Sequence, residues 1–171
     1  YKYGTTDVTR TMSLNKQTKK IKDIFTYVLK GHIAVASANL NKIKRANLLD
    51  NLARKFLNKK GLDYPHGTGH GVGFFLNVHE SPVAISKGYK MKIKPGQVMS
   101  NEPGFYKKGA FGIRLENMIY VNKLKNKIFF KNLTMVPFDK DLINIDLLNY
   151  KEKNYLINYN LEIYSNIQKY L

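Results

Sequence analysis

The sequence contains 171 residues, no cysteine, and 29 Lys and Arg residues against 12 Asp and Glu, which gives a formal net charge of +17. A chain of this length suits one domain, which buries roughly 70% of its unfolded surface, and its apolar content excludes wholesale disorder. No apolar run approaches the ~20 residues of a membrane-spanning helix. Without cysteine, disulfides and thiolate metal sites are excluded, so His and carboxylates are the available metal ligands.

The high positive charge has two readings. It would attract nucleic acid, an anionic membrane or acidic peptides, or it reflects a composition rich in Lys, Asn, Ile and Tyr. The cations are 25 Lys and only 4 Arg, spread along the chain, whereas proteins that read bases and phosphates rely on the Arg fork. We therefore favour biased composition and expect neither nucleic acid nor a membrane as a partner.

The first part of the chain predicts a strand followed by a helix. Residues 1–14 are rich in Thr, Tyr and Val, as strands are, so Asp7 within them indicates either a turn or a metal ligand. Asn15 is the expected N-cap of a helix, whose apolar residues recur at helical spacing as far as Ala36. His32 lies on that apolar stripe, and we expect a structural role for it.

A second helix is predicted over residues 46–57, with Gly61 ending it. The next segment, residues 62–80, is rich in Gly and His and has no helical periodicity. Alternating glycines would let the backbone approach a ligand or another strand closely. The segment is not a phosphate-binding loop, because it lacks the GKS or GKT ending.

The second half of the chain predicts strands and a final helix. Pro95-Gly96 and Lys107-Lys108-Gly109 mark turns between runs that are rich in β-branched and aromatic residues. The expected strands are residues 97–102, 111–121 (paired with the first) and 129–136, and the expected helix is residues 147–171.

Four side chains from separate predicted elements carry the strongest chemical signal: Asp7, His70, Glu102 and Glu116. A site for two divalent ions needs carboxylates that bridge ions ~3.5–4 Å apart, often with an imidazole. Such carboxylates in apolar strands cost several kcal/mol unless they are paired or metal-bound. A structural salt bridge, such as Arg114 with Glu102 or Asp7, would also satisfy them. The residues alone leave the two readings about even.

A series of motifs in order along the chain then favours the metal site: GTTDVTRT, FTYVLKGHIAVA, GLDYPHGTGHGVG, FLNVHE, EPGFY, GAFGIRLENMIYV and LTMVPF. Together they resemble the catalytic domain of the aminopeptidase P family of Xaa-Pro aminopeptidases, and the eukaryotic cytosolic type most closely. The resemblance covers essentially the whole chain. It implies the α+β pita-bread fold of the creatinase and aminopeptidase group, in which helices pack on a curved antiparallel sheet.

The resemblance also implies the metal ligands. Asp7 and Glu116 would bridge two divalent ions, His70 would be the imidazole ligand, and Glu102 would be a ligand that also shuttles protons. The ions implied are usually Mn²⁺. Asn101 stands where relatives often have Asp, which would alter the charge beside Glu102 and the metal preference.

The implied reaction is the hydrolysis of the N-terminal Xaa-Pro bond of peptides. A metal-bridging hydroxide would attack the carbonyl carbon, and His79 would help to stabilise the oxyanion. Glu102 would carry the proton to the proline nitrogen. The family pattern also places His66 and His79 against the substrate, and Tyr106 and Arg114 in the pocket for the proline ring.

The family's first metal-ligand Asp falls outside this sequence, since counting back from Asp7 to its position passes Tyr1. We therefore expect residues 1–171 to be the C-terminal portion of the catalytic domain, with residues 147–171 as a C-terminal helical extension. The N-terminal part of the same protein is then an expected partner. Alone, this portion is expected to bind metal poorly, to be inactive and to expose apolar surface.

Two other functions are open. A prolidase would use the same metals but cleave only dipeptides. A catalytically silent pita-bread protein would bind partners through its Lys surface, although such proteins usually replace the ligands that stand here. The remaining expectations are peptide substrates with proline in second position, a cytoplasmic location with a digestive compartment as the alternative, and a homodimer. The apolar helix near the C-terminus would either join two copies or pack only on its own sheet.

Overall fold

The structure is a computed structural model and describes residues 3–75 and 77–170. Tyr1, Lys2, Leu76 and Leu171 belong to the predicted first strand, the FLNVHE motif and the predicted last helix, and lie outside the described residues. The helices are α1 (Lys19–Ala36), α2 (Ala46–Asn58) and α3 (Tyr150–Ile167), with short 3-10 turns at Lys140–Leu142, Ile145–Leu147 and Gln168–Tyr170. The strands are β1 (Gly69–Gly71), β2 (Glu80–Ile85), β3 (Val98–Asn101), β4 (Gly104–Lys107), β5 (Phe111–Arg114), β6 (Asn117–Leu124) and β7 (Lys127–Asn132).

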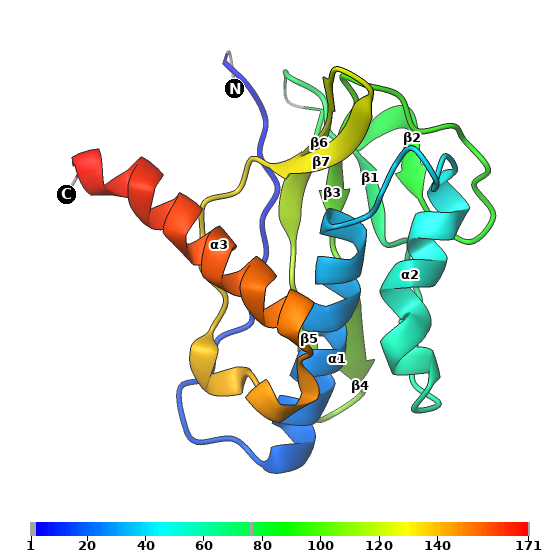
Figure 1. Cartoon of the computed structure of the whole chain (residues 1–171). Helices are drawn as coiled ribbons and strands as arrows, with labels where there is room; N and C mark the ends of the chain where they lie inside the picture. Colours follow the sequence, from blue (N-terminus) through cyan, green and yellow to red (C-terminus); the bar gives the residue numbers. More distant parts are fainter. Residues whose placement is uncertain (1–2, 76, 171) are drawn as a thin grey trace.

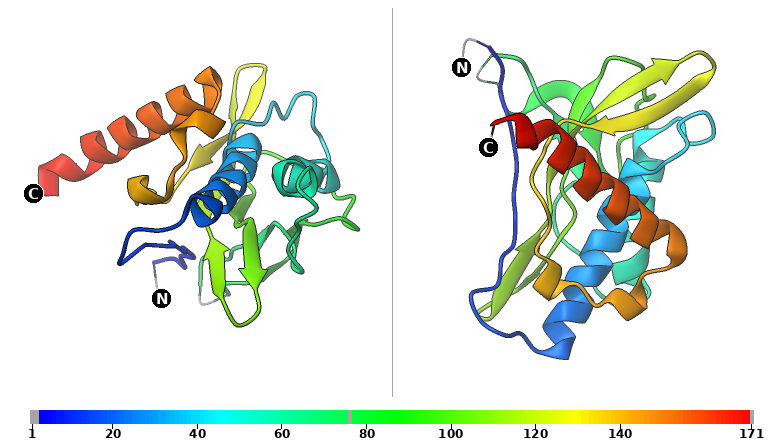
Figure 2. Two further views of the ribbon diagram at one scale, coloured as in Figure 1. Left: turned by 90° about the horizontal axis from the view of Figure 1, so that it is seen from below. Right: turned by 60° about the vertical axis from the view of Figure 1, so that its left-hand side comes forward.

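The strands form one antiparallel sheet in the order β2-β1-β3-β6-β7 and a separate β4-β5 hairpin. Helices α1 and α2 lie side by side against one face of the sheet, and α3 crosses beside α1 (Figure 1). The views in Figure 2 show that the C-terminal end of α3 projects away from the rest of the molecule. The predicted α+β architecture, with helices on an antiparallel sheet, is confirmed.

The middle of the sheet permits unusually close approach of its strands. A Cβ atom on Gly69 would lie 2.0 Å from the backbone oxygen of Ser100 on β3, a distance that no real side chain tolerates. Glycine is therefore required where β1 passes β3. This is the close backbone approach that the alternating glycines predict, although the strands β1 and β2 themselves were not predicted.

Helix α1 begins later than predicted. Its N-cap is Thr18, whose hydroxyl accepts a hydrogen bond from the backbone N–H of Ile21, so the expected N-cap Asn15 is wrong. Helix α2 follows the prediction closely, and Gly61 beyond its end has φ +68°, the left-handed conformation that favours glycine.

The predicted strand over residues 1–14 is wrong for the part that the structure describes. Residues 3–14 run extended along the molecule, and their one ladder contact is an isolated bridge between Thr9 and Glu116. The Thr-rich composition favours an extended backbone. Because this segment pairs with the rest of the chain only at Thr9 and Glu116, it does not form a strand of the sheet.

The predicted strand pair over residues 97–102 and 111–121 is also corrected. The segment 111–121 is interrupted at Leu115 and Glu116, because its first part (β5) pairs with the missed strand β4 and its second part (β6) pairs with β3. The backbone N–H of Glu116 bonds instead to Thr9 O. The strand predicted over residues 129–136 is shifted to β7, whose register follows from the tight turn that pairs Leu124 with Lys127.

Helix α3 closes the core on the side of α1. Asn149 forms a capping box with Glu152, which explains why the helix begins at Tyr150 and not at Leu147. Glu152 also pairs with Lys30 of α1 at 2.6 Å, with both side chains largely buried. The buried face of α3 packs with α1 and the β4-β5 hairpin. Among the described helices, none is long and apolar enough to cross a membrane.

His32 lies in this core, as its place on the apolar stripe predicts. Its side chain is fully buried, its ring meets the ring of Phe138 edge-on at 5.1 Å, and neither ring nitrogen has a hydrogen-bond partner among the described residues. Burial lowers the pKa of His32 to about 3, helped by the nearby charge of Arg10. His32 is therefore neutral in the folded protein.

This burial predicts a pH-dependent stability. Because the folded pKa of His32 lies below the unfolded value of 6.5, the unfolded state binds the extra proton between these two values. The free energy of unfolding should therefore fall as the pH drops below 6.5, with a contribution approaching about 1.4 kcal/mol per pH unit. Denaturant titrations from pH 8 to pH 5 should show this slope reduced in a His32→Leu variant. Parallel curves for the two proteins would contradict the assignment.

Candidate metal centre

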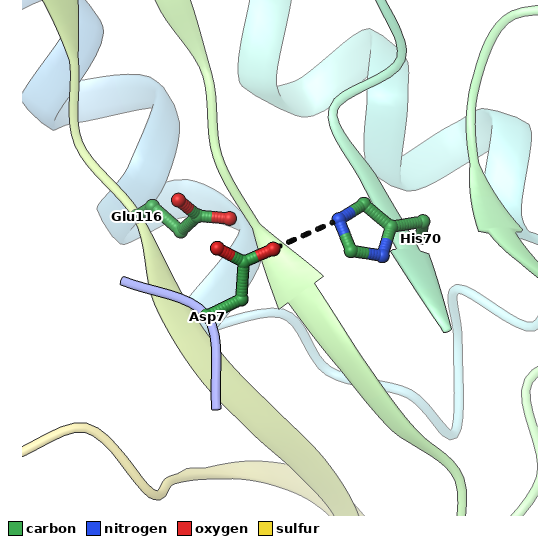
Figure 3. Close-up of side chains that lie close together, drawn as sticks. All are labelled: Asp7, His70 and Glu116. Carbon is green, nitrogen blue, oxygen red and sulfur yellow. Dashed lines mark ion pairs between the residues drawn. The ribbon is translucent and has the colours of Figure 1, made fainter. Parts of the chain in front are cut away.

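Asp7, His70 and Glu116 come together although they stand far apart in the sequence. Each offers one ligand atom, and these atoms all lie within 4.8 Å of one another. Asp7 comes from the extended first segment, His70 from β1, and Glu116 from the break between β5 and β6, and all three point to one place (Figure 3). The distance between Asp7 Oδ2 and His70 Nε2 is 3.3 Å.

Glu102, the first residue after β3, reaches the same cluster of side chains. Its Oε1 atom lies 3.3 Å from His70 Nε2 and accepts a hydrogen bond of 3.1 Å from the hydroxyl of Ser100. The same hydroxyl accepts a hydrogen bond from the backbone N–H of His70 at 2.9 Å. Ser100 thus fixes the imidazole and the carboxylate relative to each other.

The hydrogen bond on the far side of the His70 ring indicates its tautomer. Nδ1 lies 2.9 Å from the backbone oxygen of Gly71, which can only accept, so the ring proton belongs on Nδ1. Nε2 then faces the oxygens of Asp7 and Glu102, where a bound cation would have it as a ligand. Metal-binding histidines are held by this kind of bond from the other ring nitrogen to a carbonyl or carboxylate.

Without a cation, the environment of Glu102 and Glu116 disfavours their charged forms. Burial raises the pKa of Glu116 to about 7; the hydrogen bond from Thr9 acts in the opposite direction, and the negative charges of Glu102 and Asp7 add to the rise. Burial also raises the pKa of Glu102, with a smaller contribution from Asp7 and with His70 and Arg114 acting in the opposite direction. Two neighbouring acids with raised pKa values form a site that a divalent cation would relieve.

The donor set fits such a cation. Three carboxylates and one neutral imidazole are the ligands that borderline and hard divalent ions prefer, and carboxylates can bridge two of them. The alternative of a structural salt bridge accounts for little, because Arg114 Nε stands 3.7 Å from Glu102 Oε2 and the arginine side chain is 38% exposed. Among the described residues, no ion pair joins Arg114 to Asp7 or Glu116.

Three of the other predicted site residues form a chain of hydrogen bonds beside the carboxylates. Arg114 Nε donates to the hydroxyl of Tyr106 at 2.8 Å, and that hydroxyl lies 2.8 Å from Nε2 of His66. Nδ1 of His66 is 2.7 Å from the backbone oxygen of Gly67, so Nε2 is the acceptor and Tyr106 donates to it. The hairpin β4-β5 supplies Tyr106 and Arg114, which are diagonal neighbours, since Arg114 pairs with Gly104 and Tyr106 with Gly112.

His79 lies next to His70. The centres of the two imidazole rings are 4.1 Å apart, and His79 itself is exposed to solvent. All eight residues selected from the sequence therefore gather around one place: His66, His79, Tyr106 and Arg114 flank the cluster of Asp7, His70, Glu102 and Glu116.

Sequence reasoning missed the residues that support the cluster. Thr9 Oγ1 donates to Glu116 Oε2 at 2.5 Å, Ser100 joins His70 to Glu102, and Arg10 donates to the backbone oxygens of Thr9 and Glu116. The sequence signal that could have found them is their position, because each lies within two or three residues of a proposed ligand. Arginine is also scarce in this chain, and Arg10 is one of only 4.

Comparison with known proteins gives a consistent result. Residues 1–123 match metallopeptidase family M24, and residues 127–171 match the C-terminal region of peptidase M24. The probable Xaa-Pro aminopeptidases P of Fusarium vanettenii and Botryotinia fuckeliana are 44% and 47% identical over 99% and 95% of this chain. This chain spans 29% and 26% of those two proteins, so it corresponds to less than a third of their length.

Solved structures agree. The X-prolyl aminopeptidase from Caenorhabditis elegans, described as a cytosolic enzyme with a di-nuclear active site, has a TM-score of 0.90 and 40% identity over 98% of this chain and 28% of its own. The prolidase from Pyrococcus furiosus has a TM-score of 0.67 and 30% identity over 75% of this chain and 36% of its own. These matches confirm the resemblance to aminopeptidase P and the pita-bread fold.

Because the family match covers residues 1–123, well over half of the sequence, this chain belongs to metallopeptidase family M24.

Proposed function

We propose that this chain is the C-terminal portion of the catalytic domain of a dinuclear-metal aminopeptidase that hydrolyses the N-terminal Xaa-Pro bond of peptides. The observation that carries the proposal is the convergence of three carboxylates on the imidazole of His70. The names of the relatives support the same activity. Residues 147–171 form its C-terminal helical extension in this proposal, and the longer protein supplies the remaining ligand.

In the proposed site, Asp7, His70, Glu102 and Glu116 are the residues of this chain that would hold two divalent ions. When bound, the ions lower the pKa of a shared water, so that hydroxide is available near neutral pH. Mn²⁺ is the proposed ion, since a carboxylate-rich set with one imidazole suits it. Asn101 precedes Glu102 in the sequence, but its buried side chain donates to the backbone oxygen of His32 at 3.0 Å, so it adds no charge to the ligand set.

Glu102 is the proposed proton carrier. Its carboxylate is buried within the ligand cluster, 3.3 Å from His70 Nε2, and a carboxylate held in position at the reacting centre is a usual proton carrier. It accepts the proton of the attacking water and gives it to the proline nitrogen, which must be protonated before it can leave. His79, beside His70 and exposed, is placed to donate to the oxyanion that forms on the substrate carbonyl.

The proposed proline pocket uses the hydrogen-bonded chain of His66, Tyr106 and Arg114. Because Arg114 donates to Tyr106 and Tyr106 donates to His66, each ring has one fixed orientation. Fixed aromatic and imidazole walls suit a rigid pyrrolidine ring, which loses little conformational freedom on binding.

Prolidase activity is the second candidate, since prolidases with 30% and 33% identity share this fold. A silent binding protein is the third, but it would have no need for four metal-binding side chains held together. We expect the longer protein, loaded with Mn²⁺, to release the first residue from Xaa-Pro-Xaa tripeptides and to lose this activity after chelation.

The substrate assay separates the three candidates. Cleavage of Xaa-Pro dipeptides alone would indicate a prolidase. No release from tripeptides by the metal-loaded protein, together with tight and salt-sensitive RNA binding, would favour the silent binding protein.

A second prediction concerns Glu102. Glu102→Gln keeps the size of the side chain but cannot carry a proton, so kcat should fall on the order of 10²–10⁴-fold. The matched control is Glu162→Gln on α3, which makes the same change away from the cluster and should leave kcat unchanged. Steady-state kinetics at saturating Mn²⁺ provide the measurement. A Glu102→Gln enzyme with near-normal kcat would remove Glu102 from proton transfer.

We also propose that the protein is cytoplasmic and forms a homodimer through the outer face of α3. Ile157, Leu161 and Tyr164 lie at helical spacing on that face and are 56%, 59% and 65% exposed. Another face, with Leu156, packs on the core, which leaves the exposed face available to a second copy in this proposal.

The dimer has a direct test. Leu161→Glu should convert the longer protein to monomers in sedimentation equilibrium, because an unpaired buried charge at an interface costs several kcal/mol. Asn160→Glu, one residue away and also exposed, should leave the dimer intact. A wild-type protein that is monomeric at micromolar concentration would refute the dimer.

A further inference from the structure

Arg10 holds several parts of the chain together next to the proposed metal centre. Its Nη1 atom donates to the backbone oxygens of Thr9 at 2.9 Å and Glu116 at 2.7 Å. Its Nη2 atom donates to Oδ1 of Asn117 at 2.7 Å and to the hydroxyl of Tyr159 at 3.1 Å. One planar guanidinium thus joins the first segment, the start of β6 and helix α3, which a lysine could not do.

The two proposed bridging carboxylates depend on this junction. Asp7 stands in a segment that no sheet holds, and Thr9, two residues on, is the residue that meets Glu116. Thr9 Oγ1 donates to Glu116 Oε2, and Glu116 N–H donates to Thr9 O. Arg10 clamps the backbone of both residues at this bridge, so it sets the separation of Asp7 from Glu116.

Helix α3 in turn holds Arg10. Tyr159 is 2% exposed, and its hydroxyl accepts hydrogen bonds from Arg10 and from Nδ2 of Asn117 at 3.2 Å while it donates to the backbone oxygen of Val136 at 2.8 Å. A phenol has one donor and two acceptor positions, so these three bonds use all of them. The ring stacks on Phe138 at 5.3 Å, and the guanidinium lies over that same ring at 4.4 Å.

We propose that Tyr159 is a positioning residue for the metal centre, which acts through Arg10 to fix Asp7 against Glu116. The C-terminal helix then has a part in metal binding, although it contributes no ligand. The inference rests on the proposed function only in requiring that these carboxylates bind metal, and it is independent of the peptide substrate. Carboxylates that repel one another in a buried site need such external support before a cation arrives.

Metal affinity, and not activity alone, provides the test. The longer protein is freed of metal by chelation and titrated with Mn²⁺ by calorimetry. Tyr159→Phe removes the hydroxyl but keeps the stacked ring, and it should weaken Mn²⁺ binding by about tenfold or more, as loss of a supporting hydrogen bond does in other metal sites. Arg10→Lys, which keeps the charge but loses the fork, should weaken binding by at least as much.

Tyr155→Phe is the matched control. Tyr155 is on the same helix, stacks on Tyr159 at 6.1 Å, and has a buried hydroxyl that accepts from Nδ2 of Asn132 at 3.1 Å. It therefore loses a comparable hydrogen bond without touching Arg10, and its Mn²⁺ affinity should stay within about twofold of the wild type. Equal weakening in both variants would show that α3 acts only through general stability and would overturn the inference.

A double-variant cycle tests the route through Arg10. If Tyr159 acts by holding that guanidinium, Arg10→Lys combined with Tyr159→Phe should bind Mn²⁺ no more weakly than Arg10→Lys alone. Additive losses, or an unchanged affinity in Tyr159→Phe, would overturn the inference. Tight metal binding with no Xaa-Pro cleavage would remove the proposed activity and leave this inference standing, whereas a wild-type protein that binds no Mn²⁺ would remove both.

Discussion

The mutual repulsion of buried carboxylates is the constraint on which this structure depends. Asp7, Glu102 and Glu116 approach one another around Nε2 of His70, and burial disfavours the charged form of the two glutamates. Left to themselves, such groups would separate or take up protons. They stay together because each comes from a different element and because neutral donors and a guanidinium hold the backbone from behind. The cluster is arranged for a cation at a cost in stability that the surrounding fold offsets.

The fold provides that support through its topology. Sheet order β2-β1-β3-β6-β7 sets β1 next to β3 and β3 next to β6, which places His70, Glu102 and Glu116 at neighbouring positions. Asp7 lies outside the sheet and reaches the site through the bridge between Thr9 and Glu116. The position of Asp7 therefore depends on the hydrogen bonds of Arg10 and, through Arg10, on α3. Helix α3 therefore helps to position the ligand cluster, although it contains none of the proposed ligands.

The sequence predicted the site better than the fold. Residue type and motif spacing identify Asp7, His70, Glu102 and Glu116 because ligand chemistry depends on identity, and the structure brings all four together. Helix α2 was predictable since its periodicity is local. The broken strand at Glu116 was not, because pairing with β4 or β3 is decided by residues far away in the chain. The helix N-cap is Thr18 and not Asn15 for a similar reason. Both residue types favour the N-cap position, and the packing of α1 decides which of them occupies it.

The strand that carries His70 shows how the missed structure and the predicted chemistry are related. Between His70 and Gly71 the pairing of β1 with β2 changes register, and a Cβ on Gly71 would lie 2.2 Å from the backbone oxygen of Glu80. Such irregularities turn a side chain away from the direction that a regular ladder would give it. The same Gly71 carbonyl accepts a hydrogen bond from Nδ1 and thereby turns Nε2 toward the carboxylates. The glycines of this stretch are needed less for room at a ligand than for the backbone geometry that aims one imidazole.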